Sequence, residues 1–360
     1  MPDTWTHYHP VRIISGPGCI QEFASHLKGN PWILLTSPGF TRRGTTDRLK
    51  ALVSPHTLQV YDQVEPNPDL DHLDQLTRHY RQNMPRGILA LGGGSVLDTA
   101  KVLSLTLPCS LDNPLHAVLR QGEEYSWNTS LEVIALPATA GTGAEVTPFA
   151  TVWDRLNNKK HSISNELAYP ELALLDPELT LSLPHKQTLY PGLDAVSHAL
   201  ESLWNKNATA ISTAYAWQAL SLALENLPDV LDDPGNLASR QNMQHASLLA
   251  GLAISRTKTA IAHSISYPLT SYYQVPHGLA CSFTLPRLLD RHLESLADTT
   301  WKKELLQDLQ AFLSGLDLDS HIEKYATQEQ ILSLQDHMLS KDRADNYIFH
   351  PTPLEQIIRP

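Results

Sequence analysis

One carboxylate and three histidines have residue types and spacing that could bind a metal ion. Asp194 and His198 are four residues apart in a segment with helical periodicity, so both side chains emerge on one face of a helix. His263 and His277 follow downstream, fourteen residues apart. One carboxylate and three imidazoles can hold Fe²⁺ or Zn²⁺ with a position open for a substrate oxygen. Because the chain has 17 histidines, a chance pair on a helix is the alternative.

A glycine-rich turn has the composition of a phosphate-binding loop. It follows an apolar segment, Gly87–Leu91, and precedes a segment with helical periodicity. Glycines let the backbone approach phosphate oxygens, and a helix N-terminus offers unpaired N–H groups and a positive dipole end. The turn consists of Gly92, Gly93, Gly94 and Ser95. It matches neither G-x-x-x-x-G-K-[ST] nor G-x-G-x-x-G, so a tight turn without a ligand is the alternative.

A second loop, rich in glycine and threonine, spans residues 137–147 and follows the apolar segment Glu132–Leu136. Open parallel sheets bind ligands at the carboxyl ends of their strands. Thr139, Thr142 and Thr147 could therefore contact a cofactor through hydroxyl and backbone N–H groups. An ordinary surface loop has the same composition.

The first half of the chain alternates short apolar runs with amphipathic stretches, a pattern typical of a parallel sheet covered by helices. The predicted strands are Trp32–Thr36, Thr57–Tyr61, Gly87–Leu91 and Glu132–Leu136. Leu70–Gln82 is predicted as a helix, and Phe149–Trp153 and Glu171–Asp176 as a further extended pair. The turns between these segments are rich in glycine and proline.

From about Pro184 onward, helical periodicity replaces the strand pattern. The predicted helices are Gly192–Trp204, Ile211–Asn226, Leu237–Ser255 and Leu305–Leu313. At 360 residues the chain exceeds what one core usually supports. We therefore predict an α/β dinucleotide-binding domain with a Rossmann-like parallel sheet over 1–180 and an all-helical metal- and substrate-binding domain over 181–360. Ligands of such domain pairs are expected in the cleft between the domains.

Composition excludes several classes of partner. The net charge of −11, with no long run of lysine or arginine, argues against nucleic acid and anionic membranes. Three scattered cysteines fit neither a disulfide framework nor a thiolate zinc site and favour a reducing compartment. The sequence contains neither a signal peptide pattern nor a long apolar run. We expect a cytoplasmic protein that acts on a small molecule.

Four segments together resemble the iron-containing (group III) alcohol dehydrogenase family in order and spacing, within a resemblance that extends from Gly16 onward. These segments are 92–101, 137–147, 192–201 and 263–277. The resemblance implies a dehydroquinate synthase-like architecture and hydride transfer between a nicotinamide cofactor and a small aldehyde or alcohol. It also implies one divalent metal, Fe²⁺ or Zn²⁺, that polarises the carbonyl group. We further expect a homodimer.

The resemblance assigns roles to individual residues. The implied metal ligands are Asp194, His198, His263 and His277. The glycine turn and Ser95 would hold the cofactor pyrophosphate, and Asp98 would line the nicotinamide side, where it is also a candidate catalytic residue. The other candidates for cofactor contact are Gly92, Thr139, Thr142, Thr147 and Lys160.

Two positions depart from the pattern of the family. Many members carry a histidine four residues after the third metal ligand that is assigned to proton relay, and here that position is Tyr267. The general acid is therefore Tyr267, the cofactor ribose with water, or no protein group. After the first predicted strand, Ser37 stands where NAD-preferring relatives often place an aspartate. Its neutral side chain, with Arg42 or Arg43 nearby, favours NADPH over NADH.

Shorter segments, at 149–154, 198–208 and 258–270, are similar to those of phosphonoacetaldehyde reductases. This similarity implies reduction of phosphonoacetaldehyde to 2-hydroxyethylphosphonate in phosphonate biosynthesis. A phosphonate dianion needs fixed cationic donors, and the candidates are Arg256, Lys258 and Lys206. Arg256 and Lys258 would lie near the metal if the segment up to His263 is helical or folds back. The alternative is that all three are solvated surface cations.

Three other functions compete with this hypothesis. A reductase of simple aldehydes, such as lactaldehyde or butyraldehyde, would use the same metal site. A lyase of the dehydroquinate synthase type would bind NAD without net consumption, but it would place a glutamate and two histidines around zinc. The third is a nucleotide-binding or scaffold protein without catalytic activity that kept the glycine turn. The presence of all four ligand positions argues against it.

Overall fold

The computed structural model describes residues 4–295, 301–349 and 354–358. The described residues divide into two compact units. One, the α/β unit, contains His9–Thr139 and Ala144–Thr180. The other, the helical unit, contains the described parts of Leu181–Pro360 together with those of Met1–Tyr8 and the short segment Ala140–Gly143.

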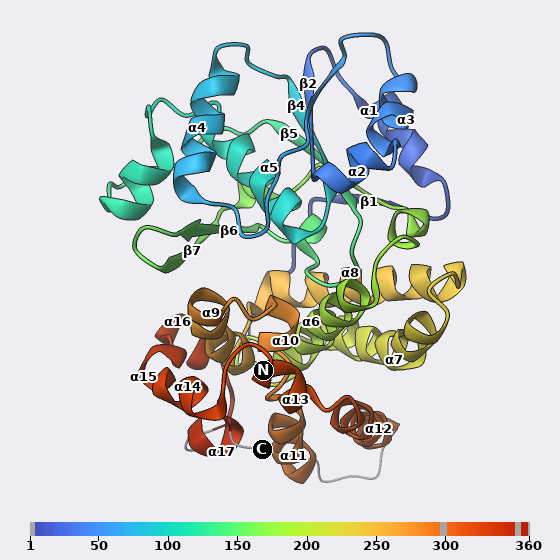
Figure 1. The fold of residues 1–360 in the computed structure, drawn as a ribbon, viewed down its shortest axis with the longest axis vertical. Helices are drawn as coiled ribbons and strands as arrows, with labels where there is room; N and C mark the ends of the chain where they lie inside the picture. Colours follow the sequence, from blue (N-terminus) through green and yellow to red (C-terminus); the bar gives the residue numbers. More distant parts are fainter. Residues whose placement is uncertain (1–3, 296–300, 350–353, 359–360) are drawn as a thin grey trace. The chain divides into compact units, whose positions relative to one another are not determined.

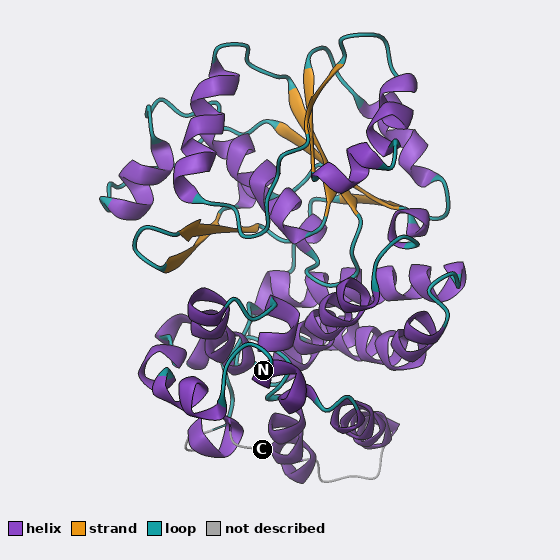
Figure 2. Cartoon of the chain, viewed as in Figure 1, coloured by secondary structure: helices purple, strands orange, loops and turns teal. Residues whose placement is uncertain are grey.

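A six-stranded parallel sheet forms the centre of the α/β unit, in the order β1-β8-β5-β4-β2-β3 (Figures 1 and 2). Its strands are β1 (Arg12–Ser15), β2 (Trp32–Thr36), β3 (Leu58–Tyr61), β4 (Gly87–Gly92), β5 (Glu132–Pro137) and β8 (Leu172–Leu175). The predicted parallel sheet is confirmed, and five of its strands lie within one residue of their predicted bounds. Periodicity missed β1, whose half-exposed residues at the sheet edge lack a continuous apolar run.

The two further extended segments are both confirmed as strands, but they lie in different sheets. Phe149–Trp153 lies in β6 (Phe149–Asp154), which forms an antiparallel hairpin with β7 (Lys159–Ser164). Glu171–Asp176 contains β8, which joins the main sheet between β1 and β5. Strand β7 was missed because its polar sequence, KKHSIS, has only one buried residue, Ile163.

Side chains of the central strands alternate between two apolar layers, as expected for a sheet covered on both faces. In β2, Ile33 and Leu35 pack on the side of α4 (Leu70–Arg81) and α5 (Gly94–Thr106). Trp32 and Leu34 pack on the opposite side. Figure 1 shows α4 and α5 on one side of the sheet and the short helices α1 (Phe23–His26), α2 (Pro38–Arg42) and α3 (Thr45–Ala51) on the other.

The helical unit is built around three long helices that pack against one another: α6 (His185–Leu203), α7 (Ala210–Asp232) and α8 (Leu237–Thr257). Its described residues form no strand (Figure 2). The remaining helices are α9 (Ile261–Tyr273), α10 (His277–Ala280), α11 (Leu285–Ser295), α12 (Trp301–Gly315), α13 (Leu318–Glu323), α14 (Gln328–Ser333), α15 (Gln335–Met338), α16 (Lys341–Ala344) and α17 (Leu354–Ile358).

Helix α6 starts seven residues before the predicted Gly192. Pro191 and Gly192 look like helix breakers in the sequence, yet both lie inside α6. A Cβ at Gly192 would lie only 2.7 Å from a methyl carbon of Leu227. The glycine therefore allows α6 and α7 to pack closely, and the tertiary contact compensates for its low helix propensity.

No described helix is both long enough and apolar enough to cross a membrane.

Candidate metal centre and cofactor site

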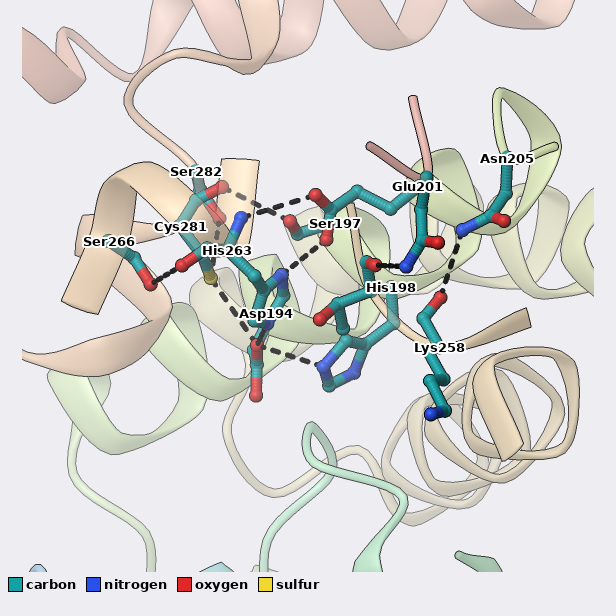
Figure 3. A network of polar contacts seen from close by, with 12 residues as sticks. Asp194, Ser197, His198, Glu201, Asn205, Lys258, His263, Ser266, Cys281 and Ser282 are labelled. Atoms are coloured by element: carbon teal, nitrogen blue, oxygen red, sulfur yellow. Dashed lines mark hydrogen bonds and ion pairs between the residues drawn. The ribbon is translucent and has the colours of Figure 1, made fainter. Parts of the chain in front are cut away.

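Helix α6 presents three charged or imidazole side chains on one face, because Asp194, His198 and Glu201 are spaced four and three residues apart. All three are buried, with at most 5% of each residue exposed. Helix α9 contributes His263, and His277 is the first residue of α10. The four predicted ligands therefore come from three helices, and the structure brings them together. Figure 3 shows three of them, Asp194, His198 and His263.

The nitrogen atoms of the three histidines converge on one carboxylate oxygen. From Asp194 Oδ1, the Nε2 atoms of His263, His198 and His277 lie at 3.3, 3.5 and 3.9 Å. Ligand atoms that surround a tetrahedral ion at about 2.1 Å lie about 3.4 Å from one another. The three distances from Asp194 Oδ1 are therefore close to the spacing of ligand atoms around a bound divalent ion.

Glu201 fixes the orientation of one imidazole. Its carboxylate accepts hydrogen bonds from the backbone N–H of His263, at 3.2 Å, and from the same residue's Nδ1. Because Nδ1 then carries the hydrogen, the Nε2 lone pair of His263 points at Asp194 Oδ1. Two acceptors that face each other need a proton or a cation between them, and this is the arrangement of a metal ligand held by an outer carboxylate.

Without an ion, the protonation states of the group depend on one another. Burial would raise the pKa of Asp194, but the surrounding imidazoles outweigh burial and hold it well below its usual range. Burial would lower the pKa of His263, but Glu201 and Asp194 raise it to about 9. Burial lowers the pKa of His198. In the ion-free protein a proton on His263 thus takes the place of a cation, and metal binding would release it.

A fifth side chain, Cys281, also faces the group. Its Sγ donates to Asp194 Oδ1 at 3.3 Å, and one ligand atom from each of Asp194, His263, His277 and Cys281 lies within 4.8 Å of the others. Burial raises the pKa of this thiol well above its ordinary value, so it is present as the neutral thiol. Neither Cys281 nor Glu201 was predicted from the sequence as part of the metal site. Their spacing could have indicated both, since each lies one helical turn beyond a predicted ligand.

Close backbone packing holds α10 against α6. A Cβ at Gly278 would lie 1.9 Å from the carbonyl oxygen of Tyr190, so only glycine allows this approach. His277 immediately precedes this contact. Its position beside Asp194 therefore depends on a glycine whose role is steric.

The glycine turn of the α/β unit has the predicted strand, turn and helix order. Strand β4 ends at Gly92, Gly93 is the N-cap of α5, and no side chain caps that helix end. The backbone N–H groups of Val96 and Leu97 bond to the Gly93 carbonyl. A Cβ at Gly93 would approach the Thr139 side chain to 3.2 Å, so the two predicted cofactor segments are in contact. Because no side chain caps α5, the backbone N–H groups of its first turn can bind an anion.

The residues predicted to select between NADPH and NADH lie on and beside the short helix α2. Ser37 is the N-cap of α2, and β2, β4 and β5 are neighbours, so Ser37, Gly93 and Thr139 lie at the same edge of the sheet. Arg42 is exposed in the last turn of α2. The Arg43 guanidinium lies 4.5 Å from the Phe40 ring centroid.

Hydrogen bonds already engage several of the predicted cofactor residues. The Ser95 hydroxyl accepts from the backbone N–H of Asn67 at 3.2 Å, and an Asp98 oxygen accepts from that of Thr151 at 3.0 Å. The buried Thr147 hydroxyl accepts from Lys101 Nζ at 3.1 Å.

The two remaining candidates for cofactor contact are Lys160 and Thr142. Lys160 Nζ lies 5.5 Å from the Trp153 ring centroid. Thr142 belongs to the helical unit.

Tyr267 lies beside the metal ligands. It is on α9, and its ring is stacked on that of His277, with centroids 6.3 Å apart and planes 13° apart. Burial raises the pKa of Tyr267 to about 12, so the phenol keeps its proton at neutral pH.

The three predicted substrate cations have exposed side chains. Arg256 lies in the last turn of α8 and Lys258 is its C-cap with a positive φ of 62°, so the segment up to His263 is not one helix. Asn205 Nδ2 donates to the carbonyl oxygen of Lys258 at 3.2 Å (Figure 3). Lys206 donates its backbone N–H to the Asn346 carbonyl. In both of these hydrogen bonds the lysine contributes a main-chain atom.

Comparison with known proteins agrees with this fold and site. The family model described as iron-containing alcohol dehydrogenase matches residues 10–177, and that of the C-terminal part of the Fe-containing alcohol dehydrogenase family matches residues 188–357. Sulfoacetaldehyde reductase of Bilophila wadsworthia is 33% identical over 78% of this chain and 73% of its own length. Phosphonoacetaldehyde reductase of Streptomyces viridochromogenes is 35% identical over 71% of this chain and 65% of its own length.

A solved structure extends the comparison to nearly the whole chain. Sulfoacetaldehyde reductase from Bifidobacterium kashiwanohense, determined in complex with NAD⁺, has a TM-score of 0.88 at 28% identity and covers 99% of this chain and 97% of that one. Fold and site thus define an oxidoreductase with an α/β unit and a helical unit. The chain belongs to the iron-containing alcohol dehydrogenase family.

Proposed function

We propose that this enzyme reduces a small aldehyde that carries a sulfonate or phosphonate headgroup to the corresponding alcohol, with a nicotinamide cofactor and one divalent metal. The observation that carries the proposal is the convergence of three imidazole nitrogens on Asp194 Oδ1 at the spacing of a tetrahedral ion. When bound, the cofactor supplies the hydride and the ion acts as a Lewis acid toward the carbonyl oxygen.

The protein's own groups would hold the ion and the cofactor and supply a proton. Asp194, His198, His263 and His277 would hold the ion, with Glu201 fixing the His263 ring. The uncapped start of α5 after Gly93 would hold the pyrophosphate. Tyr267, which keeps its phenol proton, is positioned beside His277 as the protein group that can donate a proton to the product oxygen.

The substrate class rests on what two relatives share. One is named for sulfoacetaldehyde and the other for phosphonoacetaldehyde, and the two match this chain at similar identity. Both molecules are two-carbon aldehydes with a tetrahedral oxyanion attached to the carbon next to the carbonyl group. We therefore widen the predicted phosphonoacetaldehyde to this class, and reduction of simple neutral aldehydes is the competing function.

NADPH is the proposed cofactor, although a related structure contains NAD⁺. Ser37 carries no charge that would repel a 2′-phosphate, and Arg42 is exposed on the same short helix. Ser37→Asp should shift the ratio of kcat/KM from NADPH toward NADH by about tenfold or more. An unchanged ratio would remove Ser37 from cofactor selection.

The function is tested by following reduced nicotinamide at its near-ultraviolet absorbance. NADH and NADPH are each offered with sulfoacetaldehyde, phosphonoacetaldehyde, lactaldehyde and butyraldehyde, with Fe²⁺ or Zn²⁺ added. We expect turnover of at least one anionic aldehyde at a kcat/KM at least tenfold above the neutral ones. Turnover of neutral aldehydes alone would favour the competing function, and no net cofactor consumption would favour a lyase. The predicted homodimer is checked by sedimentation of the same preparation.

A further inference from the structure

A cation on the C-terminal helices lies close to the candidate metal centre. The guanidinium carbon of Arg343, on α16, lies 4.4 Å from the centroid of the Tyr267 ring. That ring is stacked on His277, one of the four candidate ligands. Guanidinium, phenol and imidazole thus form a continuous series that ends at the metal centre. Sequence analysis did not select Arg343, which is 66 residues beyond His277.

Hydrogen bonds on both sides of α16 fix this arginine against α9. The backbone N–H of Ser340 donates to Ser264 Oγ at 2.9 Å, and Ser264 directly follows His263. Beyond α16, Asn346 Nδ2 donates to the carbonyl oxygen of Thr259 at 2.9 Å. Ser264 and Asn346 are buried, so these bonds are partly shielded from water. A group held in place before binding loses less conformational entropy when a ligand arrives.

Within the described part of the chain, no carboxylate pairs with the guanidinium of Arg343. The side chain of this arginine is half-buried. The contact with Tyr267 involves the ring face, whereas the five N–H groups of a guanidinium point outward in its plane. That fork matches two oxygens of a tetrahedral anion.

We propose that Arg343 binds the sulfonate or phosphonate headgroup of the aldehyde and so determines substrate specificity, an inference that rests on the proposed function. In a two-carbon aldehyde the headgroup is attached to the carbon next to the carbonyl. When the carbonyl oxygen faces His277 and Asp194, the headgroup lies only a few bonds away, beside Tyr267. Arg343 reaches this place from a half-buried position, whereas Arg256, Lys258 and Lys206 are exposed.

The test compares Arg343→Gln, Arg343→Lys and, as a matched control, Arg256→Gln. For Arg343→Gln we expect kcat/KM for the anionic aldehyde to fall about 10- to 100-fold, mostly through KM, because a hydrogen-bonded ion pair is lost. Turnover of butyraldehyde should change less than about threefold. Arg343→Lys keeps the charge without the bidentate fork and should give an intermediate loss.

Ethanesulfonate and ethylphosphonate, which lack a carbonyl group, serve as inhibitors of butyraldehyde reduction. They should inhibit the wild type and Arg256→Gln but not Arg343→Gln. The stronger inhibitor identifies whether the site prefers the sulfonate or the phosphonate. A merely structural role for Arg343 would instead lower turnover of neutral and anionic aldehydes alike and leave inhibition unchanged.

The outcomes separate this inference from the proposed function. If the wild type reduces no anionic aldehyde, the proposed function fails. If it does, and Arg343→Gln retains both the preference and the inhibition, the inference about Arg343 is wrong while the function stands. Loss of both in Arg256→Gln alone would assign the headgroup to the end of α8. Arg343→Lys provides the answer if the glutamine variant does not fold.

Discussion

Two clusters of buried charged groups, one in each unit, differ in how their charge is balanced. In the α/β unit, the ammonium of Lys101 is fully buried and donates to the Thr147 hydroxyl and, at 2.9 Å, to the Phe149 carbonyl. Asp98 and, more weakly, the buried Glu145 attract the same ammonium. Donors and acceptors are supplied by the protein itself, so this cluster needs no ligand.

In the helical unit, the cluster around Asp194 consists mainly of groups that accept hydrogen bonds or bind metals. Three imidazole nitrogens face a single carboxylate oxygen, and Glu201 holds one ring so that its lone pair points inward. The difference shows how a structural polar cluster can be told from a ligand site. The first is complete when the chain has folded, and the second is completed by a cation.

The largest effect should follow removal of the central carboxylate. Asp194→Ala should abolish metal binding and lower turnover by about 1,000-fold or more, because it removes the atom on which the imidazoles converge. The chain should remain folded. Metal content after dialysis and the circular dichroism spectrum measure both points, with the exposed Asp232→Ala at the end of α7 as control. Full activity in metal-stripped Asp194→Ala protein would contradict the proposed site.

Lys101→Met should reduce stability rather than metal binding. The change leaves the Phe149 carbonyl and Glu145 buried without their cation, and we expect a loss of about 3 kcal/mol in the free energy of unfolding. Urea titrations should show the same loss with and without added metal. The double variant Lys101→Met, Glu145→Gln should recover part of it, because the uncompensated carboxylate is gone. A loss that depends on metal would contradict the distinction between the two clusters.

Glu201→Gln should weaken metal binding by about 10- to 100-fold without abolishing it. The amide oxygen can still accept from His263 Nδ1, but it carries no charge to strengthen the ligand. Competition with a chromophoric chelator measures the affinity, and the exposed Glu225→Gln on α7 is the control. If both variants bind metal equally, Glu201 does not support the site.

Much of the α/β unit could be predicted from the sequence because its signals are local. The glycine turn is four consecutive residues between a strand and a helix, and Trp32–Thr36 is a continuous buried run. Strands β1 and β7 were missed because their residues are largely half-exposed or polar. Which strands pair depends on the whole sheet, so the sequence predicted Phe149–Trp153 and Glu171–Asp176 as extended but not that they belong to different sheets.

The candidate site of the helical unit was less predictable, because its members are far apart in the chain. Spacing alone linked Asp194 to His198, whereas joining them to His263 and His277 required resemblance to a family. Glu201 was within reach of the helical spacing. Arg343 was not, since its place depends on hydrogen bonds that anchor α16 to Ser264 of α9 and to Thr259, which precedes α9.

The smallest effect should appear in the pH dependence of stability. Burial raises the pKa of Glu145 from 4.5 to about 7, against the attraction of Lys101. Between these values Glu145 keeps a proton in the folded protein that it releases in the unfolded chain, so its contribution to the free energy of unfolding should fall as pH rises from 4.5 to 7. Glu145→Gln should make the slope of this fall shallower by at most about 1.4 kcal/mol per pH unit. Urea titrations of metal-free protein at several pH values measure it, and an unchanged slope would show that Glu145 is ionised in the fold and that its charge is balanced differently.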